Sequence, residues 1–327
     1  MTARACFEIH GAGLAVVADA PAVIDALALR LAPFAAPADV TPDLTFEFAS
    51  GTRLARPPGP GRPFYETPFG ALEYHDGADA VWGELDGVDL VCEPGAGRAR
   101  FASAAFEGET LYLATHPLTT ICLMEIFKRR GLYALHAGCL TTPGGTGVLI
   151  AGPSGAGKST LTMALARAGM AFLSDDVVFL SVSTDNVEAL AFPDALGVTA
   201  GTATFFPELA RGAAYAAADG FPKQLVRVED VWNVEMPTSC EPRALLFPEI
   251  VSGTGSLLPL EGREALLRLV PDVLLTQPAG SQSHLRALAE LLDQVDCFRI
   301  RCGRDLAANA ELVTGLLARI RTSSPAA

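Results

Sequence analysis

The 327-residue sequence lacks long runs of apolar or basic residues and has no paired cysteine motif. No stretch approaches the ~18 consecutive apolar residues that a membrane-spanning helix requires, so we expect no membrane partner. The 24 basic and 37 acidic residues give a formal net charge of −13, which argues against a nucleic-acid partner. The seven cysteines include no C-x-x-C pair. Their scatter and odd number predict reduced core thiols rather than disulfide or zinc sites.

The beginning of the sequence has no secretory signal pattern, because Glu8 and His10 interrupt any apolar segment there. Together with the unpaired cysteines, this pattern predicts a cytoplasmic protein. Half of the residues are hydrophobic, so the chain contains enough apolar side chains for one large domain or two modest ones.

A complete phosphate-binding loop occupies residues 152–159, which read Gly-Pro-Ser-Gly-Ala-Gly-Lys-Ser. An apolar strand pattern at 147–151 precedes it and a helical pattern at 160–168 follows it, which is the context that the motif requires. The glycines allow main-chain N–H groups to turn toward one anion, and the helix contributes its positive end. We therefore expect a nucleoside triphosphate with Mg²⁺. The motif alone does not distinguish a kinase from an ATPase, a GTPase or a transporter motor.

The candidate nucleotide-binding residues form one continuous segment. They are Gly152, Pro153, Ser154, Gly155, Ala156, Gly157, Lys158, Ser159 and Thr160. Lys158 is expected to reach the β- and γ-phosphates, and the Ser159 hydroxyl is expected to ligate Mg²⁺.

Two adjacent carboxylates, Asp175 and Asp176, follow the loop after one short predicted helix. They end a short apolar strand at 170–174 and precede a second apolar run at 177–182. A single helical excursion would return them to the sheet beside the phosphate site. There, one carboxylate could hold Mg²⁺ and the other could accept the proton of an attacking hydroxyl. The alternative is an ordinary Ser-Asp-Asp turn.

His136 lies upstream, in an apolar strand pattern at 132–140. A turn signal at 142–145 then predicts a β-hairpin that leads into the strand before the loop. On this strand, His136 could orient a phosphate or assist proton transfer. The alternative is a histidine that serves only the core.

The order of these elements resembles a known family. Leu135-His136-Ala137-Gly138, then the loop, then Ser174-Asp175-Asp176-Val177 are similar to the catalytic core of HPr kinase/phosphorylase. They are more similar still to the wider group of HPr-kinase-like serine kinases, some of which act in lasso-peptide tailoring. The resemblance covers about residues 132–182. It implies a mixed α/β fold of the PEP-carboxykinase type with a P-loop core.

The resemblance also implies roles for individual residues. Lys158 and the loop amides would hold ATP, while Ser159 and Asp176 would hold Mg²⁺. Asp175 would act as the base toward a substrate hydroxyl, and His136 would support the phosphoryl site. True HPr kinases are hexamers, so a homo-oligomer is left open.

The chain departs from that family after the aspartates, where no Glu-Val-Arg-Gly-Leu-Gly-type segment occurs. We therefore expect an acceptor other than HPr, and the sequence leaves a reverse phosphorylase activity open. The expected reaction is transfer of the γ-phosphoryl group of ATP to a hydroxyl, foremost a serine of a peptide or small protein. Two alternatives stay open. One is a small-molecule hydroxyl kinase, and the other is a nucleotide-switched binding module or partner-dependent ATPase.

The predicted domains follow from the position of this core. Residues 1–112 contain several segments that alternate apolar and polar residues, which predicts a smaller β-rich N-terminal domain. That domain would recognise the substrate or simply cover one face of the core sheet. Residues 113–322 are expected to form the P-loop kinase domain, and residues 323–327 a tail.

Overall fold

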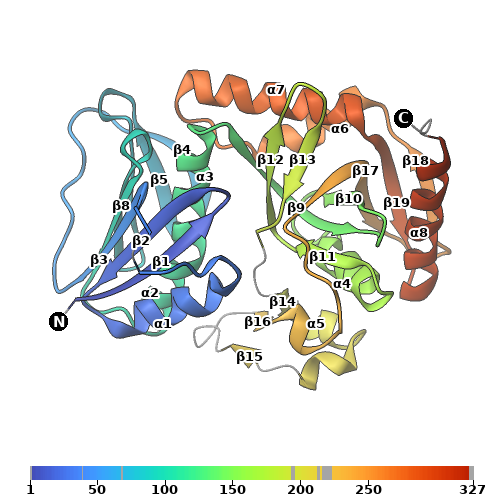
Figure 1. The fold of residues 1–327 in the computed structure, drawn as a ribbon, viewed down its shortest axis with the longest axis horizontal. Coiled ribbons are helices and arrows are strands. Elements are labelled where there is room, and N and C mark those ends of the chain that lie inside the picture. The colour runs from blue at the N-terminus through green and yellow to red at the C-terminus, as the bar shows by residue number, and fades with distance from the viewer. Residues whose placement is uncertain are drawn as a thin grey trace. The chain divides into compact units, whose positions relative to one another are not determined.

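The computed structural model describes residues 2–38, 40–67, 69–192, 196–211, 214–215 and 223–323. It is a mixed α/β protein whose chain divides into two compact units (Figure 1). Unit 1 contains Met1–Arg130 and Leu274–Gln282, and unit 2 contains the other described residues. Unit 1 therefore extends beyond the expected domain boundary at residue 112. Most of the expected tail, residues 324–327, lies outside the described residues.

Unit 1 is built on an eight-stranded sheet with the order β1-β2-β3-β8-β7-β6-β5-β4. Strand β3 pairs in parallel with both β2 and β8, and the other neighbours are antiparallel. The strands are β1 (Ala3–Ile9), β2 (Ala12–Ala18), β3 (Leu44–Ser50), β4 (Arg62–Thr67), β5 (Gly70–His75), β6 (Ala80–Leu85), β7 (Val88–Glu93) and β8 (Arg98–Ser103).

The helices of unit 1 follow local sequence signals. Helix α1 (Pro21–Arg30) starts with proline in its first turn, where the missing N–H costs nothing. Helices α2 (Gly108–Leu113) and α3 (Thr119–Lys128) are joined by a π-helical turn, η4 (Ala114–Leu118). Pro117 lies inside that turn, where it removes one N–H from the regular helical pattern.

A buried polar network attaches residues 274–276 to α3 within unit 1. The ammonium of Lys128 donates to Glu125 Oε1 at 2.6 Å, to the Leu274 carbonyl at 2.8 Å and to Thr276 Oγ1 at 2.8 Å. The Thr276 hydroxyl donates in turn to Glu125 Oε2 at 2.6 Å. Burial lowers the pKa of Lys128, whereas the neighbouring Glu125 carboxylate raises it. Because each buried charge meets an opposite charge or a dipole, the network pairs groups that would be costly to bury alone.

Unit 2 is built on a second eight-stranded sheet with the order β10-β9-β12-β13-β17-β19-β18, in which β11 also pairs with β9. Strand β10 pairs with β17 as well as with β9, so it has a neighbour on each side. The strands are β9 (Leu132–Thr141), β10 (Thr146–Ala151), β11 (Ala171–Ser174), β12 (Val177–Val182), β13 (Val187–Leu190), β17 (Ser239–Ile250), β18 (Ser256–Pro259) and β19 (Asp296–Cys302). The β9–β10 pairing confirms the predicted hairpin.

Helices cover both faces of this sheet, because its central strands are apolar on both sides. Val148 and Ile150 of β10 face the core that α4 (Lys158–Arg167) and α8 (Leu306–Ser323) complete. Leu149 and Ala151 face the opposite core, which α6 (Gly262–Leu269) and α7 (Pro278–Gln294) complete. The phosphate loop therefore leaves a strand that is fixed from both faces.

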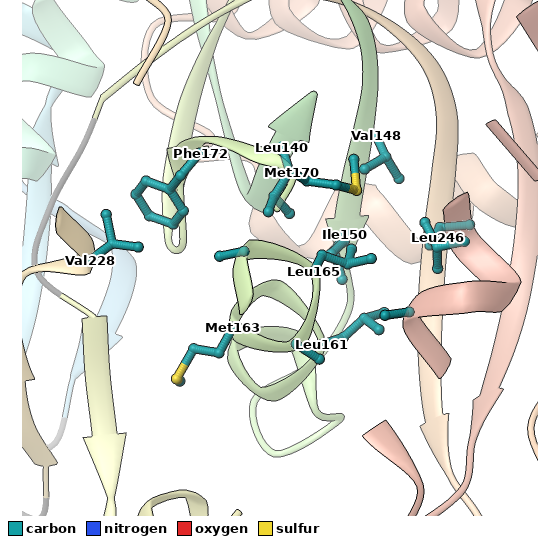
Figure 2. Close-up of a cluster of buried hydrophobic side chains, with 14 of the residues drawn as sticks. Leu140, Val148, Ile150, Leu161, Met163, Leu165, Met170, Phe172, Val228 and Leu246 are labelled. Carbon is teal, nitrogen blue, oxygen red and sulfur yellow. The ribbon is translucent and has the colours of Figure 1, made fainter. Parts of the chain in front are cut away.

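Helix α4 packs closely on the sheet. Figure 2 shows Leu161 and Leu165 of this helix beside Ile150 of β10. On β9, a Cβ atom built at Gly138 would lie only 2.3 Å from Thr162 Oγ1. Glycine at this position therefore permits a close approach between β9 and the helix that begins with Lys158.

The remaining described elements are short. Strands β14 (Leu196–Thr199), β15 (Ala214–Tyr215) and β16 (Lys223–Val226) form a three-stranded sheet with the order β14-β16-β15. The short helices are η1 (Ala32–Phe34), η2 (Asp76–Ala78), η3 (Pro94–Ala96), α5 (Ala200–Ala203), η5 (Pro207–Arg211), η6 (Val228–Asp230) and η7 (Val270–Asp272). No helix in the described part of the chain is long and apolar enough to cross a membrane. All seven cysteines are buried and free, as the sequence predicts.

The Gly138–Thr162 approach gives a stability prediction. We expect Gly138→Ala to lower the free energy of unfolding by about 1–3 kcal/mol, because the added methyl group must displace α4 or bend β9. The thermal unfolding midpoint measures the effect. Adding Thr162→Ala should restore most of the loss, with Thr162→Ala alone as the reference. A double variant as unstable as Gly138→Ala would contradict this reason.

Candidate phosphate and phosphoryl-transfer site

The loop between β10 and α4 depends on glycine at three positions. Gly152, Gly155 and Gly157 have φ values of 139°, 80° and 99°, which residues with side chains rarely adopt. Gly157 is the residue at which the chain enters α4, and no side chain caps the helix there. The first-turn N–H groups of an α-helix have no partners within the helix, so this end of α4 is suited to an anion.

Lys158 extends back into its own loop. Its ammonium donates to the Gly152 carbonyl at 2.6 Å and lies 3.4 Å from the Pro153 carbonyl. The residue is only 8% exposed. The Lys158 ammonium is a nearly buried cation beside the main-chain groups of the loop. Such a cation favours a ligand that carries negative charge.

The other loop residues differ in their exposure to solvent. Pro153, Ser154 and Gly155 are exposed at the tip, while Ser159 and Thr160 are half-buried in the first turn of α4. The Ala156 N–H donates to the Pro153 carbonyl at 3.2 Å, so this amide is used inside the loop. The segment of predicted nucleotide-binding residues thus ranges from exposed at its tip to nearly buried at Lys158.

The two aspartates occupy different environments at the turn between β11 and β12. The buried Ser174 hydroxyl accepts from the N–H groups of Asp176 and Val177, at 3.3 and 3.2 Å, and donates to the Phe192 carbonyl. This bonding fixes the turn. Asp175 is 6% exposed, whereas the side chain of Asp176 is 65% exposed. Adjacent residues thus place one carboxyl group inward and the other outward.

Strand β9 brings His136 between the loop and the aspartates. Ala137 pairs with Ala151, the last residue before the loop, and His136 pairs with Val177, the first residue after Asp176. The imidazole Nδ1 lies 3.0 Å from Asp176 Oδ1. The hydrogen bond with Asp176 raises the pKa of His136, while burial and the Lys158 charge lower it.

Asp272 is a further member of this group that the sequence did not indicate. It ends η7, which follows α6. Its carboxylate lies close enough to His136, Lys158 and Asp176 to interact with their charges. Burial raises the pKa of Asp272, and the two cationic groups lower it. A Val-Pro-Asp sequence far from the loop carries no local signal for such a position.

The residues near the loop suit a Mg²⁺–triphosphate ligand, provided that phosphate oxygens complete the coordination of the metal. In the described part of the chain, no group of three or more His, Cys, Asp or Glu side chains could hold a metal by itself. Mg²⁺ is commonly held by one or two protein oxygens together with phosphate oxygens and water. Ser159 and Asp176, which the sequence resemblance suggests as ligands, carry such oxygens, and a metal held by these two alone would also need phosphate oxygens.

Comparison with known proteins finds a weak similarity to a solved structure. No family model matches the chain, and no curated protein matches it. Among solved structures, it is similar to the HPr(Ser) kinase/phosphatase from Coxiella burnetii. That match has 16% identity and a TM-score of 0.31, and it covers 58% of this chain and 99% of the other. The relation is weak and at the level of fold, and at this TM-score it carries no argument about activity.

The His136–Asp176 pair gives a prediction about pH. Because the pKa of folded His136 is raised above its ordinary value of about 6.5, the pair stabilises the folded state fully below that pH. This contribution is lost as pH rises through the higher, folded-state pKa. In Mg²⁺-free protein, we expect Asp176→Asn to lower the pKa of His136, and Asp272→Asn to lower it by less. An NMR titration of the imidazole protons measures both.

The matched control is Asp185→Asn, which changes an exposed carboxylate in the turn between β12 and β13. It should leave the pKa of His136 unchanged. If Asp176→Asn and Asp185→Asn gave the same titration curve, the ion pair would not be the cause of the raised pKa.

Proposed function

We propose that this protein is an ATP-dependent phosphotransferase that moves the γ-phosphoryl group to a hydroxyl. The main observation behind the proposal is that β9 lies between the phosphate loop and the buried carboxyl group of Asp175. The loop that holds Lys158 leaves the sheet on one side of this strand, and buried Asp175 lies on the other. A phosphate site beside a nearly buried carboxylate provides both requirements of the reaction, which are charge stabilisation and a proton acceptor.

In the proposed reaction, the ammonium of Lys158 and the main-chain N–H groups at the start of α4 hold the phosphates of ATP. Asp175 accepts the proton of the acceptor hydroxyl, whose oxygen bonds to the γ-phosphorus as the bond to the β-phosphate oxygen breaks. ADP leaves with the bridging oxygen. Mg²⁺, held by Ser159 and Asp176 when bound, would offset the phosphate charge. His136 keeps Asp176 oriented through their 3.0 Å contact.

For the acceptor, we infer a serine of a peptide or small protein. The support is the order of His136, the loop and the aspartate pair, which resembles HPr-kinase-like serine kinases. Unit 1, with its own eight-stranded sheet, is the part of the chain that we assign to acceptor recognition. A cytoplasmic location agrees with the buried, free cysteines.

The test of the base uses Asp175→Asn. We expect transfer to fall by about 10²–10⁴-fold, because the amide cannot accept the hydroxyl proton, while the Kd for Mg–ATP changes little. Label transfer from γ-labelled ATP to fractionated peptides and metabolites of the host measures the first quantity. Calorimetric titration measures the second. Asp185→Asn is the matched control, and Lys158→Ala should weaken ATP binding itself.

The pattern of label separates the alternatives. Label in a peptide fraction with wild type alone supports the proposal and identifies the acceptor. Label in a small molecule changes the acceptor class, and free phosphate without labelled product favours a switch or partner-dependent ATPase. Full transfer by Asp175→Asn would falsify the role of Asp175 as the base.

A further inference from the structure

An apolar side chain lies exposed beside the phosphate loop. Ile250, the last residue of β17, is 71% exposed, more than any other large hydrophobic residue in the described part of the chain. A Cβ atom built at Gly157 would lie 3.5 Å from Ile250 Cγ1 and 3.7 Å from Cδ1. The isoleucine therefore lies beside Gly157, the residue that leads into α4, within contact distance of a methyl group placed there.

The position of Ile250 is fixed by the main chain around it. It pairs with Cys302 of β19, and the next N–H, of Val251, donates to the Cys302 carbonyl at 2.9 Å. Buried Asn309 then accepts from the Gly303 N–H and donates to the Gly303 carbonyl. An exposed isoleucine held on a paired strand is a preorganised apolar surface, which favours binding of a flat apolar group.

The arrangement of strands gives the direction in which a nucleotide would extend. Strand β10 has β9 on one side and β17 on the other. The β9 side carries His136, Asp175 and Asp176, so the reacting γ-phosphate must point there. The nucleoside, at the opposite end of the phosphate chain, then extends toward β17 and β19. These strands run parallel to β10, and ligands of α/β sheets bind at the carboxyl ends of such strands.

We propose that the purine base of the nucleotide packs against Ile250. This inference rests on the proposed function, since it assumes a nucleoside triphosphate in the loop. Purine bases present flat apolar faces, and nucleotide sites are lined mainly by apolar side chains. Leu267 of α6, the next most exposed large hydrophobic residue described, is not among the nearest neighbours of a Cβ atom built at Gly152, Gly155 or Gly157.

The test compares a ligand that has a base with one that lacks it. Mg–ATP and Mg–tripolyphosphate are titrated calorimetrically into wild type, Ile250→Ser and Leu267→Ser. Leu267 is 67% exposed, so its variant is a matched control for the loss of a surface hydrophobe. We expect Ile250→Ser to weaken ATP binding by about tenfold, as the loss of roughly two buried methylene groups predicts, and to leave tripolyphosphate binding unchanged.

The ATP and tripolyphosphate affinities of the three proteins decide whether the base packs against Ile250. Selective loss of ATP affinity in Ile250→Ser, with wild-type values in Leu267→Ser, supports it. Unchanged ATP affinity, or equal weakening of both ligands, overturns it and leaves the proposed function intact. If wild type bound neither ATP nor tripolyphosphate, the loop would not be a phosphate site, and the proposed function would fail together with the inference.

Discussion

The candidate site depends on the pairing of β9 with β10 on one side and with β11 and β12 on the other. This strand places the start of the phosphate loop and the aspartate turn on the strands that flank it on either side, although α4 separates them along the chain. It also supports α4 directly, because Gly138 allows the helix to approach the sheet. Because side chains alternate along β9, Leu135, Ala137 and Cys139 lie on its other face, in the hydrophobic core that α6 and α7 complete. One strand thus fixes the loop, the helix and the carboxylates.

The charges near the loop explain why a metal belongs in the proposed reaction. His136 interacts with the carboxylates of Asp176 and Asp272, and Lys158 interacts with that of Asp272. A triphosphate beside these carboxylates would be repelled, and partial burial strengthens such interactions relative to water. A cation between phosphate and carboxylate oxygens removes that repulsion. His136 contributes in the same direction, because Asp176 and Asp272 both favour its protonated form.

Two of the connections between the units lie next to this site along the chain. The first part of unit 1 ends at Arg130, two residues before β9 begins, and another part of unit 1 begins at Leu274, two residues after Asp272. The second connection leads straight into the buried Glu125–Lys128–Thr276 network. Breaking one member of such a network leaves a buried charge without its counter-charge, so the segment after Asp272 is held firmly within unit 1.

The sequence by itself determined the features that local patterns encode. The loop glycines, Lys158, the hairpin that contains His136 and the Ser174-Asp175-Asp176 turn all follow from residues close together in the chain. Tertiary structure decided which aspartate is buried, that Asp272 interacts with His136, Lys158 and Asp176, and that Ile250 lies beside Gly157. It also divided the chain into units at Arg130 rather than near residue 112. These outcomes depend on strand pairing and packing between distant segments, whose energies arise only when the segments meet and leave no signal in either segment alone.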